Sequence, residues 1–351
     1  MRVKTQIPYL LGLLCLLTAI SYLLSAGAFA QQPFNLITSP LPINLTTTPG
    51  KAVSAELRVK NNSSAPEKLK VSLYKFSVNQ NSEVALSEKE QADDYFDWVS
   101  FTPSVFTAEP NQWKSVKMDI DVPSEAALGY YYAVGFSRAD EPTPVPSGAA
   151  LKGQVITFVL LDVEVPGAKR ELTITEFSSD KSSYEFLPAT FTIKVKNTGN
   201  IHVVPTGTIF VKRGNSTVAT LSINPGQGNV LPNSTRTFSV EWNDGFPLYV
   251  PKTNDSGQPI SNPDSTTAKT LKWDLSEANK LRIGKYSAKA VLVYDDGQRD
   301  VPQEANVGFW VVPWRILAGI LVIGSLAAVG LWAIGKKVFK ASKKLGKKKK
   351  E

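Results

Sequence analysis

Few residues in this sequence could perform acid–base, nucleophilic or metal chemistry. His202 is the only histidine among 351 residues, and Cys15 is the only cysteine. One imidazole without a nearby thiol offers neither a cysteine nucleophile nor a thiolate or multi-histidine metal site. We therefore expect no catalytic residue, no cofactor and no bound metal, and we expect His202 to be an exposed polar residue after the turn 197–200.

Two other patterns suggest chemistry at first sight. Asp93/Asp94 and Asp295/Asp296 are adjacent acids whose side chains point apart, whereas the two carboxylates of a glycosidase come from separate segments that face one cleft. The glycines of residues 225–229 are followed by neither the lysine nor the helix of a phosphate-binding loop. These residues are interpreted as turns, and the sequence predicts a protein that is not an enzyme.

Aromatic side chains are dense enough in two places to suggest a binding surface. They gather at residues 95–113 and 130–132. The candidate ligand residues are Tyr95, Trp98, Phe101, Trp113, Tyr130 and Tyr132. Exposed rings stack on sugars and on proteins, but strand alternation turns half of each group inward. Core packing and ligand contact therefore both stay open for these six residues.

The segments that position such a surface begin with an N-terminal targeting sequence. Two basic residues precede the apolar run 10–24, and Ala28 and Ala30 stand where a signal peptidase requires small residues. Residues 1–30 are predicted to be a cleaved signal peptide, with an uncleaved anchor as the alternative. Cleavage would remove the only cysteine, and a secreted chain without disulfides favours a bacterial, Gram-positive-like envelope.

A second hydrophobic segment lies near the C-terminus. Residues 316–335 carry no charge, and at about 1.5 Å per helical residue they can cross a hydrocarbon core of roughly 30 Å. We expect a transmembrane helix at 314–335, with tryptophans near both ends and a cytoplasmic tail, 336–351, that holds nine lysines. The predicted topology is a single-pass, type I protein of the cell membrane with its N-terminal bulk extracellular.

The helix also bears on self-association, and the tail on nucleic-acid binding. Gly324 and Ala328 are spaced so that two such helices could approach closely, which leaves self-association open.

The tail alone carries a charge equal to the net +8 of the chain. The region between the hydrophobic segments is therefore slightly acidic, so we expect no nucleic-acid partner.

Between the hydrophobic segments, strict alternation of apolar and polar residues predicts strands. The strands 53–61 and 189–197 both end in Val-Lys-Asn. Pro110-Asn111 and Pro232-Asn233 lead at identical spacing into further strands, and Gly129-Tyr130-Tyr131 and Gly284-Lys285-Tyr286 each open a late strand. Three matches in the same order indicate an internal duplication.

The predicted fold class is all-β. Two tandem immunoglobulin-like antiparallel β-sandwiches are expected at 33–166 and 167–312, followed by the transmembrane helix. The second sandwich is expected to carry a long insertion at 243–270, which is rich in Pro, Asn, Asp and Ser.

The chain resembles the WxL-interacting proteins of Gram-positive cell surfaces. In the first sandwich the residues that carry the resemblance are Phe34-Asn35-Leu36, 53–61, Trp98-Val99, Phe101-Thr102-Pro103, Pro110-Asn111 and Gly129-Tyr130-Tyr131. In the second they are 189–197, Gly284-Lys285-Tyr286 and the juxtamembrane helix that follows. The resemblance implies a peptidoglycan-binding immunoglobulin-like domain, a second sandwich that binds a partner or host, and a membrane anchor. The insertion 243–270 departs from that pattern.

The expected function is that of a membrane-anchored cell-surface protein, an adhesin or scaffold. Its expected partner is peptidoglycan or a wall-associated surface protein. The alternative is a membrane-tethered chaperone or secretion factor that acts by β-strand augmentation.

Overall fold

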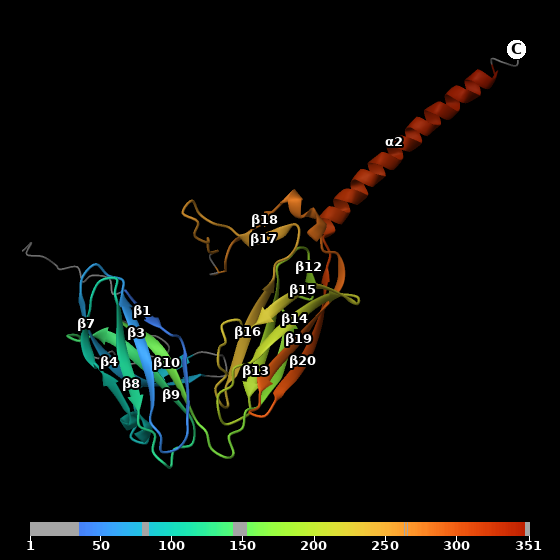
Figure 1. Cartoon of the computed structure of the whole chain (residues 1–351). Coiled ribbons are helices and arrows are strands. Elements are labelled where there is room, and N and C mark those ends of the chain that lie inside the picture. The colour runs from blue at the N-terminus through green and yellow to red at the C-terminus, as the bar shows by residue number, and fades with distance from the viewer. Residues whose placement is uncertain (1–34, 79–83, 143–152, 263, 265, 348–351) are drawn as a thin grey trace, which may run out of the picture.

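The computed structural model describes residues 35–347, except 79–83, 143–152, 263 and 265. The predicted signal peptide, including Ala28 and Ala30, and the end of the tail lie outside the described residues. The chain forms two β-sandwiches followed by one long helix (Figure 1). We call the strands of residues 36–163 domain one and the strands of residues 172–311 domain two.

Domain one consists of two sheets and a short 3-10 helix, η1 (Asp94–Trp98). The four-stranded sheet has the order β1-β3-β8-β6, and the larger sheet has the order β2-β10-β9-β4-β5 with β7 beside β4. The strands of the smaller sheet are β1 (Leu36–Ser39), β3 (Val53–Asn61), β8 (Trp113–Ile120) and β6 (Val99–Thr102). Those of the larger sheet are β2 (Ile43–Thr47), β10 (Gln154–Val163), β9 (Leu128–Arg138), β4 (Glu67–Val78), β5 (Val84–Ser87) and β7 (Val105–Ala108).

Domain two repeats this plan. Its sheets have the orders β11-β13-β16 and β12-β20-β19-β14-β15. The smaller sheet consists of β11 (Leu172–Ser179), β13 (Ala189–Asn197) and β16 (Thr235–Trp242). The larger consists of β12 (Ser183–Tyr184), β20 (Asp300–Val311), β19 (Gly284–Asp295), β14 (Thr206–Arg213) and β15 (Ser216–Ile223).

The strand order identifies both domains as immunoglobulin-like. In each domain the first strand, β1 or β11, belongs to the smaller sheet, and the chain then crosses to the larger sheet. There the next short strand, β2 or β12, pairs in parallel with the last strand of the domain. The remaining pairs between these named strands are antiparallel, as in the immunoglobulin sandwich. The predicted fold class, all-β with two tandem immunoglobulin-like sandwiches and a C-terminal apolar helix, is confirmed.

The two cores follow from the alternation seen in the sequence. In β3 the residues Leu57 and Val59 are buried while Glu56 and Arg58 are exposed. In β13 the same alternation buries Phe191, Ile193 and Val195. Each sandwich therefore encloses its own apolar core, as expected when both sheets have one apolar face.

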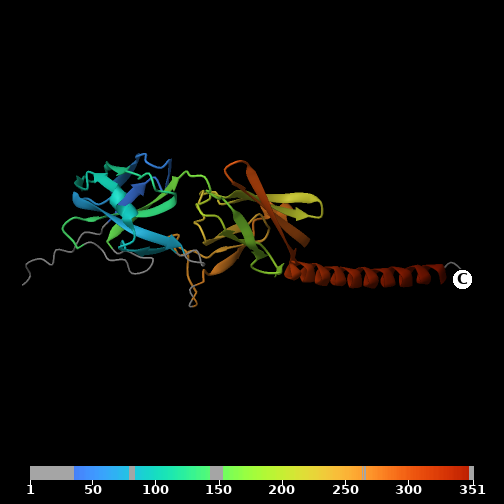
Figure 2. The ribbon, with the colours of Figure 1, turned by 90° about the horizontal axis from the view of Figure 1, so that it is seen from below.

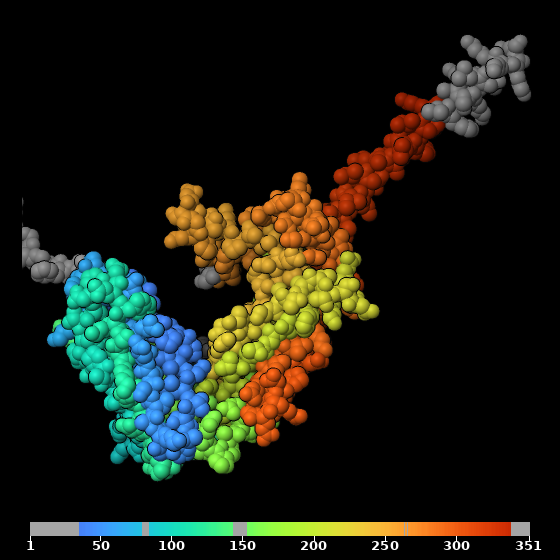
Figure 3. All heavy atoms as spheres, in the orientation of Figure 1, coloured from blue at the N-terminus to red at the C-terminus, as the bar shows by residue number. Residues whose placement is uncertain are grey.

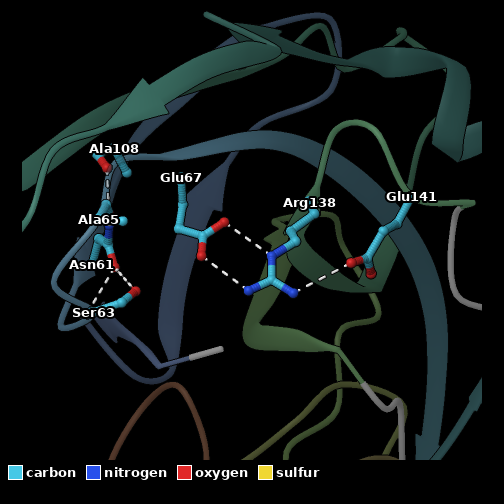
Figure 4. A network of polar contacts seen from close by, with 7 residues as sticks. All are labelled: Asn61, Ser63, Ala65, Glu67, Ala108, Arg138 and Glu141. Carbon is cyan, nitrogen blue, oxygen red and sulfur yellow. Dashed lines mark hydrogen bonds and ion pairs between the residues drawn. The ribbon is translucent and has the colours of Figure 1, made fainter. Parts of the chain in front are cut away.

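The duplication extends to a buried asparagine at the end of β3 and of β13. Nδ2 of Asn61 donates to the carbonyl oxygens of Ala65 and Ala108, at 2.8 and 3.0 Å, and its Oδ1 accepts from the backbone N–H of Ser63 (Figure 4). Nδ2 of Asn197 donates to Ile201 and Val230, both at 2.8 Å, and its Oδ1 accepts from the N–H of Gly199. Both asparagine residues are fully buried. Each joins the loop after its strand to the segment that precedes the next strand of the same sheet.

The third predicted match is shifted by one residue. Leu128 pairs with Val163 in domain one as Gly284 pairs with Val311 in domain two, and both Leu128 and Gly284 have positive φ. Gly284 is therefore equivalent to Leu128 and not to Gly129, and Tyr286 is equivalent to Tyr130. The sequence match was wrong because a shift of one residue in a strand moves every side chain to the other face.

The described part of the 243–270 segment includes a strand that makes a small sheet outside the sandwich. β17 (Leu248–Pro251) pairs with β18 (Lys269–Lys272), and a 3-10 helix, η2 (Leu275–Lys280), follows. The chain then enters β19. The C-terminal helix α2 (Trp314–Lys347) extends away from domain two as a single rod, at the end remote from domain one (Figures 1 and 2). Residues 314–337 of α2 are long and apolar enough to cross a membrane.

Candidate functional site

The outward face of the four-stranded sheet of domain one brings aromatic, aliphatic and basic side chains together. Strand register places Ile37 opposite Lys60 and Lys60 opposite Trp113, so these three form a row across β1, β3 and β8. The next row is formed by Ser39, Arg58 and Ser115. We call these two rows the Trp113 face. Its strands β1 and β3 (blue) lie at the surface turned toward the viewer in Figure 3.

The Trp113 face combines exposed apolar surface with basic groups. Trp113 is 48% exposed and Ile37 is 46% exposed. Arg58 is exposed and Lys60 is partly exposed, and neither has an ion-pair partner among the described residues. By contrast, Lys117 on the next row lies 2.7 Å from Asp119. An indole beside available cations can stack on a ring while a guanidinium or ammonium group binds a carboxylate.

The other five aromatic candidates lie in or against the core. Tyr132 is fully buried, and Tyr95, Trp98, Phe101 and Tyr130 are partly buried and pack on the same core. Four of them form one cluster, in which the ring centroid of Tyr95 lies 5.3 Å from that of Tyr130 and 5.4 Å from that of Tyr132. Trp98 lies 4.7 Å from Tyr130. Trp113 is therefore the one exposed member of the predicted set, and it stands apart from the cluster.

An ion pair holds the aromatic cluster in place. Asp93 precedes η1, which carries Tyr95 and Trp98. The carboxylate of Asp93 lies 2.9 Å from Nζ of Lys75 on β4 and accepts the backbone N–H of Glu90 at 2.9 Å. Burial raises the pKa of Asp93, but the hydrogen bonds from Glu90 and Lys75 outweigh it and hold that pKa below its ordinary value. Burial also raises the pKa of Tyr95, with the charge of Asp93 adding to the effect.

A close approach of a histidine and an acid lies in the contact between the two domains. Nδ1 of His202, from domain two, lies 3.0 Å from Oδ1 of Asp162 on β10 of domain one, and both side chains are less than a tenth exposed. Arg170 approaches the other carboxylate oxygen at 3.8 Å, and the ring of Tyr131 lies 5.8 Å from that of His202. Burial and the charge of Asp162 raise the pKa of Tyr131. The expectation that His202 is an exposed turn residue is wrong, because domain one covers it.

Sequence reasoning missed this contact, although one signal for it was present. Asp162 is the only charged residue in the strand 155–163, whose other residues are apolar except for Thr157. A buried acid in such a strand requires a partner, and the partner lies in the other domain. The contact is extended by Asn229, whose Nδ2 donates to Oδ1 of Asn44 at 3.1 Å, and by Leu231.

Leu231 packs on the outward face of the larger sheet of domain one, which is unusually apolar. Tyr74, Phe76, Leu86 and Leu160 are buried there together with Leu231. At one edge of this sheet β2 pairs with β10 only along Val159–Val163. Among the described residues, Gln154–Phe158 of β10 are therefore paired on one side only. A strand edge of this kind can accept an extended segment.

Within the described residues, no group of three or more His, Cys, Asp or Glu side chains is arranged to hold a metal ion. Three of the four acids that the sequence shows in pairs serve structural roles. Asp93 anchors η1, and Oδ1 of Asp296 accepts the backbone N–H groups of Gln298 and Arg299 in the turn between β19 and β20. Asp295 accepts the N–H of Gly297 in the same turn.

No family model matches the sequence, and no curated protein matches it. Solved structures with a similar arrangement include the class 5 fimbriae chaperone CfaA, at 12% identity over 77% of this chain and 98% of that chain, with a TM-score of 0.36. The CupB2 chaperone of Pseudomonas aeruginosa matches at 11% identity over 78% of this chain and 100% of that chain, with a TM-score of 0.31. The CsuC–CsuE chaperone–tip adhesion subunit complex of Acinetobacter baumannii matches at 12% identity over 58% and 89%, with a TM-score of 0.31. Likeness at this level carries no conclusion about the function of this chain.

Proposed function

We propose that this chain is a non-enzymatic, membrane-anchored protein of the cell surface, and that domain one binds the sugar polymer of the cell wall through the Trp113 face. The observation that carries the proposal is the row of Ile37, Lys60 and Trp113 on a solvent-facing sheet. Peptidoglycan presents sugar rings and peptide carboxylates side by side. Trp113 would stack on a ring, and Arg58 and Lys60 would bind carboxylates.

The anchor supports a location at the membrane. Residues 314–337 form an apolar helix with no buried residues, and lysines follow directly in the sequence. A basic segment after a membrane helix favours the cytoplasmic side, so the two sandwiches would stand outside. This arrangement is the one that the resemblance to WxL-interacting proteins implies.

The proposal is tested by sedimentation of the detergent-solubilised chain with isolated wall sacculi. Trp113→Ala is expected to weaken binding about tenfold, since a lost ring contact of roughly 1.4 kcal/mol changes an equilibrium by that factor. Trp310→Ala is the matched control, because Trp310 of domain two is 49% exposed and Trp113 is 48% exposed. Equal binding by both variants and the unchanged protein, or no binding by any of them, would contradict the proposal.

Salt dependence separates the two parts of the face. Arg58→Ser with Lys60→Ser is expected to weaken binding most at low salt, because solvent-exposed charge pairs are screened as salt rises. The effect of Trp113→Ala should persist at high salt.

A second candidate function is supported by the edge of β10. A membrane-tethered chaperone or assembly factor could pair an extended segment of a client protein with Gln154–Phe158, which the described residues leave open on one side. A photo-crosslinker placed at Phe158, which is partly exposed on the outward face of the sheet, or at Ser115, in the intact envelope, distinguishes the two functions. Capture of a protein from position 158 alone would favour the assembly factor, and attachment to wall fragments from position 115 would favour the wall-binding protein.

A further inference from the structure

We propose that Trp273 and Leu275 lie in the lipid headgroup layer of the outer leaflet, beside the point where α2 enters the membrane. The segment from β17 to η2 would then set how domain two rests on the membrane surface. The inference depends on the membrane anchoring stated above.

Trp273 and Leu275 are among the most exposed large apolar residues outside α2. Trp273 is 57% exposed and Leu275 is 79% exposed. The indole of Trp273 is nevertheless held in a defined position, with its ring centroid 5.7 Å from that of Phe246 and 6.4 Å from that of Phe186. Asp274 lies between Trp273 and Leu275 in the sequence. Its side chain accepts a hydrogen bond from the backbone N–H of Ser276 at the start of η2. Two apolar side chains are thus presented outward on an ordered support.

The support of Trp273 is the same segment that holds the start of α2. Glu185, next to Phe186, lies 3.3 Å from Nε of Arg315 in the first turn of α2. The N–H of Val312 donates to the carbonyl oxygen of Tyr184 at 2.7 Å. Residues 182–186 therefore contact both the chain entering α2 and Trp273. In Figure 1, the segment that carries β17 and β18 lies at the same end of domain two as the start of α2.

The aromatic residues around the start of α2 match those that membrane interfaces favour. Trp310 is 49% exposed and Trp314 is 57% exposed, and Trp side chains prefer the boundary between lipid tails and water. Trp273 adds a third indole from a segment that lies about forty residues earlier in the sequence. Because α2 fixes where the bilayer must be, the neighbouring apolar surface faces lipid headgroups and not bulk solvent.

The charges next to Trp273 and Leu275 point to apolar insertion and not to attraction by anionic lipids. Lys272 lies 3.5 Å from Asp274, and Lys280 lies 3.2 Å from Asp244. Arg282 also pairs with Asp244. Since these basic groups already have acidic neighbours, we expect the contact to form equally on zwitterionic and anionic membranes.

The test uses the full chain in vesicles, with Cys15→Ser removing the only cysteine and a single new cysteine carrying an environment-sensitive dye. Three labelled variants are compared: Leu275→Cys, Leu321→Cys within α2, and Gln298→Cys. Gln298 is exposed in the turn between β19 and β20, at the opposite end of β20 from α2. We expect lipids with a quencher on the tail near the headgroup to quench the dye at 275 and at 321, and not at 298, at equal strength in phosphatidylcholine vesicles with and without phosphatidylglycerol.

Each outcome separates the inference from the anchoring it depends on. A dye at 321 that lipid does not quench would show that α2 is not in the bilayer, and the anchoring fails. Quenching at 321 without quenching at 275 would overturn the lipid contact alone. A blue-shifted dye at 275 that lipid does not quench would mean that a protein covers this surface, which also overturns it. In the labelled 275 chain, Trp273→Ser should reduce quenching if the two side chains insert together.

Discussion

At the scale of single residues, Asn61 and Asn197 show why both sandwiches keep the same loop geometry. Each side chain satisfies two carbonyl oxygens and one N–H that are buried away from water. Buried backbone groups without partners are costly, so one asparagine stabilises three of them at once. The sequence shows these residues only as the ends of two similar strands.

Replacing either asparagine is expected to destabilise its own domain. Asn61→Ala and Asn197→Ala each leave two buried carbonyl groups unsatisfied, at a cost of about 1–3 kcal/mol per group. Thermal unfolding of each variant measures the loss. Asn215→Ala, at an exposed turn position, is the control and should leave unfolding unchanged. A variant of Asn197 that unfolds like the control would show that the two carbonyl groups find other partners.

At the scale of elements, ion pairs join η1 and the loops of domain one to its larger sheet. Asp93 joins η1 to β4 through Lys75. At the other end of β4, Glu67 accepts two hydrogen bonds from Arg138 of β9, both at 2.9 Å, and Glu141 pairs with the same guanidinium group (Figure 4). Because one guanidinium group donates both hydrogen bonds to one carboxylate, the Glu67–Arg138 pair has a defined geometry. Both ends of β4 are therefore tied to neighbouring segments by ion pairs.

Acid is expected to loosen η1. The pKa of Asp93 is lower in the folded chain than its ordinary value of 3.8. A lowered folded pKa contributes stability that is present above the unfolded pKa and is lost as pH falls through the folded pKa. Domain one should therefore lose stability below about pH 4, and Asp93→Asn should be less stable at neutral pH but should lose less on acidification.

The measurement is unfolding by denaturant, monitored by tryptophan fluorescence, between pH 3 and pH 7. Asp94→Asn serves as the control because Asp94 is exposed and adjacent. An unchanged pH dependence in Asp93→Asn would refute the role of this ion pair.

At the scale of the whole molecule, the two sandwiches meet at one end and enclose an open angle (Figure 3). His202 and Asp162 lie inside the contact, with Leu231 packed on the outward sheet face of domain one. A buried carboxylate next to an imidazole is stable only while both are present. We therefore expect the angle between domain one and domain two to depend on this pair.

Removing the pair is expected to widen the range of angles between the domains. His202→Ala leaves Asp162 with Arg170 alone at 3.8 Å, and Asp162→Asn removes the charge at almost constant shape. Small-angle X-ray scattering of the detergent-solubilised chain should show a larger radius of gyration for both variants, while thermal unfolding of each sandwich changes little. Scattering identical to that of the unchanged chain would mean that the apolar contact alone sets the angle.

The sequence alone determined the elements whose signals are local. Strict alternation at 53–61 and 189–197 identifies strands, since the period of two depends only on neighbouring residues, and an uncharged stretch at 316–335 identifies a long apolar helix whatever its neighbours are. Identical spacing after Pro110 and Pro232 even predicted the equivalence of two strands.

Only the tertiary structure decided which face each side chain occupies and what covers it. The Gly-x-Tyr match was shifted by one residue because pairing with the last strand, and not the glycine, sets the register. Four aromatic candidates joined one cluster and Trp113 alone faced solvent, because exposure depends on strands distant in sequence. His202 became buried for the same reason: its partner Asp162 lies in another domain. The sequence shows that Asp162 needs a partner, but only the folded structure shows which residue it is.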